Sequence, residues 1–269
     1  MMVLVGGVGY ATFALGGIQA RSVVERNVGA NVTPAYDSNP SSPCSIPDVR
    51  IPAKAKKEIT VIRIEHQSCP PLLGIRKTSF DLPESRLYCD KETKRKIFDF
   101  IRSVEPAEIF VLSAWNSYSP YTNREFITDG DEAEADSATT KRAIEKQVPL
   151  TLKRLSEIGQ VVAFKAWPFF PANPMNEVNR IPLLKRVNRR EVVVAPCDNF
   201  KKDGEPINAV FERVDSRIKL FDPAAKICRT KGCSSTHDNV GMYNDVYHIS
   251  TAGALQFRSE IEALLTSGD

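Results

Sequence analysis

Asp245 and His248 are the residues in this chain best suited to chemistry, and they lie three positions apart near the carboxyl terminus. One turn of chain can bring the carboxylate beside the imidazole, where it fixes the ring tautomer and stabilises the imidazolium. The other ring nitrogen can then take a proton from a nucleophile. An acid three residues before a histidine is also common as a surface hydrogen-bonded pair, so the spacing alone leaves both interpretations open.

A helix is expected directly after this pair. Ser250 or Thr251 can serve as its N-cap, and an apolar stripe follows at helical spacing, formed by Ala254, Phe257, Ile261, Leu264 and Leu265. We therefore predict a catalytic loop that leads into a C-terminal helix.

Upstream of the pair, short apolar segments alternate with amphipathic ones. Strands are predicted at residues 59–64, 109–112, 161–164 and 218–221. Helices are predicted at 91–104, at 138–158 with a break or kink at Pro149, and at 176–190 with a break at Pro182, while 191–194 form a short strand or a helix end. This alternation favours a parallel sheet covered by helices on both faces.

The functional site of such a sheet lies at the carboxyl ends of its strands. Trp115 and Asn116 follow one predicted strand, and the loop 167–171 follows the next. We expect both segments, together with the loop of Asp245 and His248, to lie at this edge.

Residues 1–20 contain no charged side chain and are long enough to span a bilayer. A signal peptide normally has Lys or Arg before its apolar run and small residues at its cleavage site, and Ile18 occupies the first small position. A buried core helix would show a polar face. We predict a transmembrane helix over 1–20, a proline-rich linker over 21–57 and a folded domain over 58–269.

Composition excludes some classes of partner. The net charge of +3 is small and is spread along the 269 residues, so no nucleic-acid partner is indicated. No Cys-x-x-Cys pair occurs, and the three histidines show no ligand spacing. We therefore predict neither a metal site nor a cofactor.

The six cysteines favour disulfide bonds in an oxidising compartment, with zinc as the alternative. Four of them lie in proline-rich or charged loop sequence, whereas buried free thiols usually lie in apolar runs. Cys228 could pair with Cys233 across a tight loop, and Cys69 with Cys89 across a longer one, although sequence alone does not fix the connectivity.

The two arginines after the apolar segment, Arg21 and Arg26, favour a cytoplasmic position for the downstream domain. The cysteines favour the opposite side of the membrane. We expect the side that the cysteines indicate, because two arginines are a small bias and helices earlier in a bundle can set the orientation.

Several stretches together resemble a known family. Cys69-Pro70-Pro71-Leu72 follows one strand, Ala114-Trp115 closes the next, and Cys228 and Cys233 precede the signature Tyr243-x-Asp245-x-x-His248-x-Ser250-x-x-Gly253-Ala254. This pattern is similar to the SGNH hydrolase-like domain that is fused behind the membrane domain of family-three acyltransferases, which O-acetylate bacterial surface polysaccharides.

The resemblance implies a three-layer α/β/α sandwich with a mostly parallel sheet of the SGNH or flavodoxin-like type. It also implies a position on the periplasmic side of the bacterial inner membrane, and acyl-ester chemistry by a Ser-His-Asp arrangement. The implied partners are an acyl donor delivered through a membrane acyltransferase domain, a polysaccharide acceptor, and the membrane itself through residues 1–20. Gly16-Gly17-x-x-Ala20-Arg21 is similar to the end of the last membrane helix, so we expect the functional protein to begin before Met1.

The chain departs from the family at the nucleophile. In the family it lies in a Gly-Asp-Ser block after the central strand, and no Gly-Asp-Ser occurs in this sequence. Residues 48–57 are too few for a strand and a helix, so we expect the family's central strand to be missing, the sheet to be gapped or rearranged, and the activity to be impaired. A non-catalytic, degenerate SGNH-like or glycan-binding domain is the alternative.

Substitute residues for the missing block are few. Ser68, Ser113 and Ser117 are candidate nucleophiles near strand ends, and Asn116 could donate a hydrogen bond to an oxyanion. Loop hydrogen bonding is the alternative role for the serines, and a turn position the alternative role for Asn116.

Overall fold

The computed structural model describes residues 2–6, 14–15, 18–24, 60–65, 69–78, 89–118, 126–130, 135–174, 194–195, 200, 204–229, 232–237 and 240–266. The chain forms two compact units. The first unit comprises Met1–Val23, Thr60–Phe169 and Ala195–Cys233, and the second comprises Val24–Ile59, Phe170–Val194 and Ser234–Asp269.

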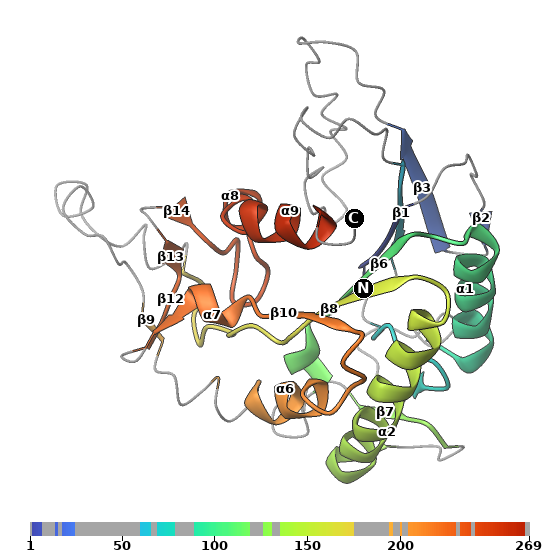
Figure 1. Cartoon of the computed structure of the whole chain (residues 1–269). Coiled ribbons are helices and arrows are strands. Elements are labelled where there is room, and N and C mark those ends of the chain that lie inside the picture. Colours follow the sequence, from blue (N-terminus) through green and yellow to red (C-terminus); the bar gives the residue numbers. More distant parts are fainter. Residues whose placement is uncertain are drawn as a thin grey trace, which may run out of the picture. The chain divides into compact units, whose positions relative to one another are not determined.

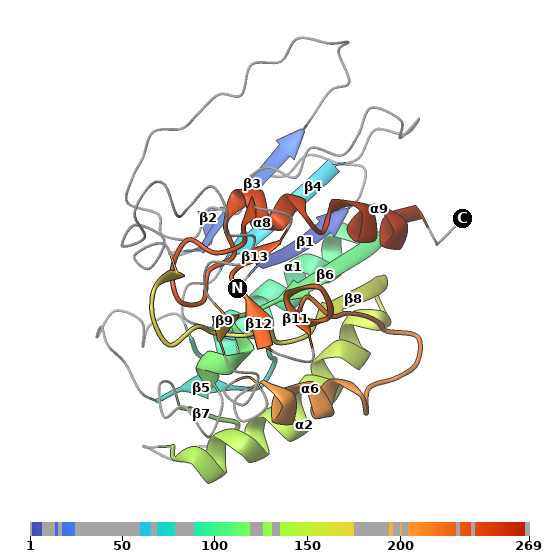
Figure 2. The ribbon, with the colours of Figure 1, turned by 90° about the vertical axis from the view of Figure 1, so that its left-hand side faces the viewer.

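A seven-stranded sheet in the order β10-β8-β6-β1-β4-β3-β2 forms the centre of the first unit. Neighbouring strands β4, β1, β6 and β8 can be followed side by side in Figure 2. The strands are β1 (Met2–Gly6), β2 (Ala14–Leu15), β3 (Ile18–Val24), β4 (Thr60–Glu65), β6 (Glu108–Leu112), β8 (Gln160–Phe164) and β10 (Lys219–Phe221). These bounds confirm the predicted strands 59–64, 109–112, 161–164 and 218–221 to within one residue at most ends.

Four of these strands run in one direction. β6 pairs in parallel with β8, and β8 pairs in parallel with β10. β1 is antiparallel to both β4 and β6, which makes β4 and β6 parallel to each other. The α/β fold with a parallel sheet is therefore confirmed, and β1 is the reversed strand among the five from β10 to β4.

β1 occupies the position where the sequence predicted a gapped or rearranged sheet. Met2 pairs with Leu112 and Glu65, and Gly6 pairs with Glu108 and Val61. Backbone groups of two neighbouring buried strands need partners, and residues 2–6 supply them on both sides. The sheet is therefore rearranged and has no gap at this position.

The helix predicted over residues 1–20 is also not what the structure has, because β1, β2 and β3 cover much of this segment. The β-branched Val3 and Val5 favour an extended chain, and the glycines at positions 6, 7, 9, 16 and 17 weaken a helix. Among the described residues, none of the helices combines the length and the apolar character needed to cross a bilayer. The predicted linker starts within β3, and its residues 25–57 lie outside the described part of the chain.

The helices of the first unit include α1 (Lys91–Val104) and α2 (Ser137–Ser156), and Asp90 and Asp136 cap their amino termini. α2 continues through Pro149, so the helix is not broken there, and the alternative of a kink at Pro149 stays a prediction. Its buried side chains on both sides of the proline keep it helical by packing, and it lies beside β8 and α6 (Figure 1). The described residues of this unit also form a 3-10 turn at Trp115–Tyr118, α6 (Glu205–Phe211) and α7 (Ala224–Ile227). The predicted helix 176–190 lies outside the described residues.

Smaller sheets complete the first unit. β5 (Arg76–Lys77) pairs with β7 (Ile127–Thr128), and β11 (Cys228–Arg229) pairs with β12 (Gly232–Ser234), both antiparallel. β9 (Val194–Ala195) joins the second of these sheets, so the segment 191–194 ends in a strand.

The second unit contains the hairpin of β13 (Thr236–His237) and β14 (Val240–Gly241), followed by α8 (Thr251–Leu255) and α9 (Arg258–Thr266) (Figure 1). The single C-terminal helix predicted from the apolar stripe is divided in two. Gln256 and Phe257 donate to the carbonyl oxygens of Gly253 and Ala254 in tighter turns, and Phe257 turns into the core.

Two disulfides, both predicted, are present among the described residues. Cys69 is bonded to Cys89 and Cys228 to Cys233, with Cα atoms 5.6 Å and 3.9 Å apart. The first bond closes a loop of 20 residues, which is worth about 3 kcal/mol on the chain-entropy account. Cys44 and Cys197 lie outside the described residues.

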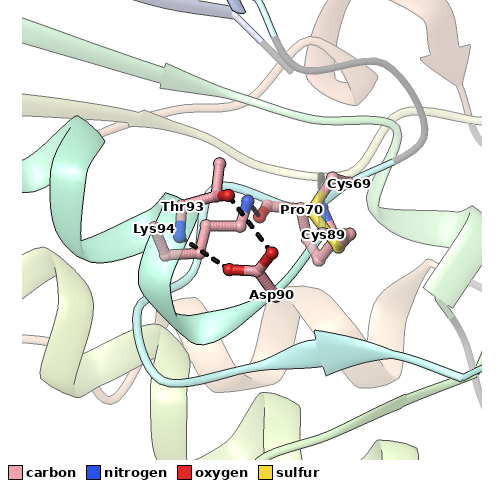
Figure 3. Close-up of a disulfide and its surroundings, with 6 residues drawn as sticks. All are labelled: Cys69, Pro70, Cys89, Asp90, Thr93 and Lys94. Carbon is pink, nitrogen blue, oxygen red and sulfur yellow. Dashed lines mark hydrogen bonds between the residues drawn. A yellow bond between two sulfur atoms is a disulfide. The ribbon is translucent and has the colours of Figure 1, made fainter. Parts of the chain in front are cut away.

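Lys94 is a buried lysine beside the first disulfide. Its amino group donates a hydrogen bond to the carbonyl oxygen of Pro70, next to Cys69 (Figure 3). It shares the buried face of α1 with Ile97 and Ile101. Burial lowers the pKa of Lys94 to about 7, and the Asp90 carboxylate offsets only part of this effect.

The low pKa of Lys94 makes the stability of the fold depend on pH. Above about pH 7 the folded state holds the neutral amine, whereas the unfolded chain binds a proton up to the ordinary lysine pKa of about 10.4. The free energy of unfolding should therefore fall as the pH drops from about 10 to about 7, by on the order of 1 kcal/mol per unit, and become level below that. Lys94→Met should remove this slope.

Urea unfolding at several pH values, with the disulfides intact, measures the slope. Lys96→Met, on the exposed face of the same helix, is the matched control and should keep the slope of the unmodified chain. Equal slopes in the unmodified chain and Lys94→Met would refute a deprotonated Lys94.

Deletion of residues 1–7 tests the place of β1 in the sheet. The deletion removes the backbone partners of both β4 and β6, so the free energy of unfolding should fall by several kcal/mol at about 1 kcal/mol per lost hydrogen bond. Amide exchange of residues 109–111 should accelerate as well. A chain shortened by residues 267–269 serves as control, and unchanged exchange in the 1–7 deletion would place β1 elsewhere.

Candidate active site

A closed loop in the second unit presents Asp245 and His248. Tyr243 and Ile249 form an antiparallel bridge, and the amide of Asn244 donates to the carbonyl oxygen of His248 at 2.9 Å. Ser250 donates its amide to the carbonyl oxygen of Met242 at 2.8 Å. The chain therefore leaves and returns at neighbouring points, and the residues between them are held in a short turn.

Asp245 holds this turn from within. Its Oδ1 accepts the amides of His248 at 2.7 Å and Tyr247 at 2.9 Å, and its Oδ2 lies 2.5 Å from His248 Nδ1. With a proton on Nδ1, the ring donates to the carboxylate and Nε2 is the nitrogen left to accept a proton. The spacing of three residues thus gives the contact that the sequence predicted.

Electrostatics keep the carboxylate ionised. Burial raises the pKa of Asp245, but the hydrogen bonds from the His248 ring and from the amides of His248 and Tyr247 outweigh it and hold the pKa below its ordinary value. The two side chains are 35% and 28% exposed, so the pair remains within reach of solvent and of a substrate. This arrangement can orient an imidazole and stabilise its protonated form.

Aromatic packing supports the loop. Tyr243 is buried and its ring meets Phe170 edge-on at 4.7 Å, and the amide of Phe170 donates to the carbonyl oxygen of Val246 at 2.7 Å. The Tyr247 ring lies 4.0 Å from the His248 ring. Phe170 belongs to the loop 167–171 that the sequence associated with the site, and it reaches the turn of the pair.

The other candidates belong to the first unit. Ser113 is buried directly after β6, and Asn116 is buried in the 3-10 turn. The Asn116 amide donates to the carbonyl oxygen of Trp167 at 3.1 Å, and the Trp115 ring nitrogen donates to the carbonyl oxygen of Phe164 at 2.8 Å. These contacts fasten the turn after β6 to the chain after β8.

The structure therefore brings Asp245 and His248 together and gives Asn116 a structural contact. An oxyanion role for Asn116 and a nucleophilic role for Ser113 or Ser117 stay predictions, and Ser68 lies outside the described residues. No group of three or more His, Cys, Asp or Glu side chains suited to a metal occurs in the described part of the chain.

Lys165 is a polar residue at the carboxyl edge that the sequence analysis passed over. Its ammonium group lies 2.6 Å from Glu212 and 3.1 Å from Asp222, which follows β10. Burial lowers the pKa of Lys165, but hydrogen bonds to the two carboxylates outweigh this and raise it. The sequence does contain a signal for this contact, because Lys165 directly follows β8 and Asp222 directly follows the parallel strand β10.

Residues 52–263 match the family described as "SGNH domain (fused to AT3 domains)". The periplasmic domain of the lipopolysaccharide acetyltransferase of Salmonella ser. Paratyphi A is a similar solved structure, with 14% sequence identity and a TM-score of 0.47, covering 73% of this chain and 69% of that chain. No curated protein sequence matches significantly.

Asp245→Asn tests how the carboxylate orients the ring. An amide can present its NH₂ group to Nδ1, so the neutral ring should shift its proton toward Nε2. Nitrogen-15 correlation spectra of the histidines, with His248→Gln for assignment, measure the tautomer. Asp215→Asn on the surface is the control, and a tautomer that is the same in Asp245→Asn and the unmodified chain would show that the carboxylate does not set it.

Proposed function

The chain belongs to the family of SGNH domains fused to AT3 domains, and from this membership we propose that it serves a membrane O-acyltransferase system acting on cell-surface polysaccharide. The proposed chemistry is transfer or hydrolysis of an acyl ester. The acyl donor arrives through the membrane acyltransferase domain, and the acceptor is a sugar hydroxyl.

The observation that carries the proposal is the hydrogen bond between Asp245 and His248. His248 acts as the general base, since its Nδ1 faces the carboxylate and its Nε2 can remove a proton from a hydroxyl group. Asp245 orients the ring and stabilises the imidazolium that forms. Such proton transfer typically contributes about 10² to 10⁴ to a rate.

Two observations support a position outside the cytoplasm. Both disulfides, Cys69–Cys89 and Cys228–Cys233, need an oxidising compartment to persist. The family description places such domains beside an AT3 domain. We propose the periplasmic side of the bacterial inner membrane as the location.

We further propose that the catalytic activity is impaired. In an SGNH arrangement the nucleophile follows the central strand at the carboxyl edge of the sheet. In this chain the strand between β4 and β6 is reversed, so Met2 lies at that edge and the residues after Gly6 leave from the opposite edge. This same observation favours the second candidate function, a non-catalytic SGNH-like or glycan-binding domain.

The purified full chain should therefore release no more p-nitrophenol from p-nitrophenyl acetate than His248→Ala does. Loss of a triad nucleophile typically removes about 10⁶ from turnover. The full chain is the appropriate material because β1 contributes to the sheet.

His237→Ala, which changes another histidine of the second unit, is the matched control for the loss of an imidazole. Turnover that depends on His248 and not on His237 would contradict impairment. Single changes of Ser68, Ser113 and Ser117 to Ala would then identify the substitute nucleophile.

A further inference from the structure

The hydroxyl group of Ser250 links the two chain segments at the base of the loop that carries Asp245 and His248. Its Oγ donates to the carbonyl oxygen of Gly241 at 2.6 Å and accepts the amide of Gly253 at 2.9 Å. The side chain is almost fully buried at 8% exposure. One hydroxyl group therefore caps α8 and also fastens the start of this helix to the end of β14.

Gly253 leaves little freedom at this point. A β-carbon added there would lie 2.3 Å from the carbonyl oxygen of Met242 and 2.7 Å from its Cα, which is closer than side chains tolerate. The first turn of α8 therefore packs directly on the backbone of Met242. Met242 also accepts the amide of Ser250, so the segments that enter and leave the loop are held side by side at these two residues.

We propose that Ser250 is a positioning residue for Asp245 and His248, acting through its hydrogen bond to Gly241. His248 lies two residues before Ser250, and its own carbonyl oxygen is bonded to Asn244 beside Asp245. Loss of the hydrogen bond from Ser250 to Gly241 allows the His248 side of the loop to move relative to the Asp245 side. The contact between Oδ2 and Nδ1 spans these two sides and is the first to lengthen.

This inference rests on the proposed function for its biological meaning, because a positioned base matters only if the pair acts on a proton. Its physical content concerns the hydrogen bond alone. It can therefore fail or hold without any turnover being measured, and the ester assay remains the separate test of the function.

Three substitutions separate the two roles of the hydroxyl group. Ser250→Thr keeps both the donor and the acceptor. Ser250→Asp keeps a good N-cap acceptor for Gly253 but, when ionised, has no proton for Gly241. Ser250→Ala loses both contacts.

Asp136→Ala is the stability control. It removes the N-cap of α2 in the first unit, where Asp136 accepts the amide of Thr139 at 2.7 Å. Removal of this cap matches the capping part of the loss in Ser250→Ala without touching the bond to Gly241.

The measurement is the exchange with water of the His248 Nδ1 proton, followed by NMR of the full chain at neutral pH. Ser250→Ala and Ser250→Asp should accelerate this exchange about fivefold, the change that corresponds to one lost hydrogen bond of about 1 kcal/mol. Ser250→Thr and Asp136→Ala should leave it near the rate of the unmodified chain. Slow exchange in Ser250→Asp, or equal acceleration in Asp136→Ala, would overturn the proposal, because capping or general stability would then explain the effect.

Discussion

Backbone pairing at the centre of the sheet is the constraint on which this fold depends. β4 and β6 run in the same direction and are separated by the width of one strand, and each presents a row of N–H and C=O groups toward the other. Buried groups of this kind are costly when they stay unpaired. Residues 2–6 satisfy both rows at once, and an antiparallel strand does so as well as a parallel one. The sheet therefore needs a strand at this place, but it does not need a particular direction.

Direction matters for chemistry. A parallel central strand delivers the residue that follows it to the carboxyl edge, where the chain after β6 and β8 also emerges. The reversed β1 delivers Met2 to that edge instead. Integrity of the sheet and delivery of a nucleophile are thus separate requirements, and β1 meets the first while the residues after it leave from the opposite edge.

The elements that sequence patterns predicted well are those whose patterns have a single interpretation. The spacing of Ile97 and Ile101 fixes α1, and the short β-branched runs fix β4 and β8. The prediction for residues 1–20 missed β1, β2 and β3, because an uncharged apolar run suits a membrane helix and a strand alike. Only the place for a strand between β4 and β6 decides between the two. Lys94 was missed although it continues the apolar stripe of α1, because a lysine at a core position is read as exposed unless its partner, Pro70, is known.

The difference between local and distant contacts explains which parts of the candidate site could be predicted from the sequence. Asp245 meets the His248 ring and the amides of Tyr247 and His248 within one turn, so three residues of sequence suffice to predict the pair. Asn116 donates to the carbonyl oxygen of Trp167, fifty-one positions along the chain, and no local sequence pattern indicates this contact. An acid–histidine pair built from local contacts can form without a nucleophile beside it, since the amides of the loop already stabilise the ionised carboxylate. The pair therefore shows that the loop orients the imidazole of His248 as a general base requires. Catalysis depends in addition on whether a hydroxyl group reaches Nε2.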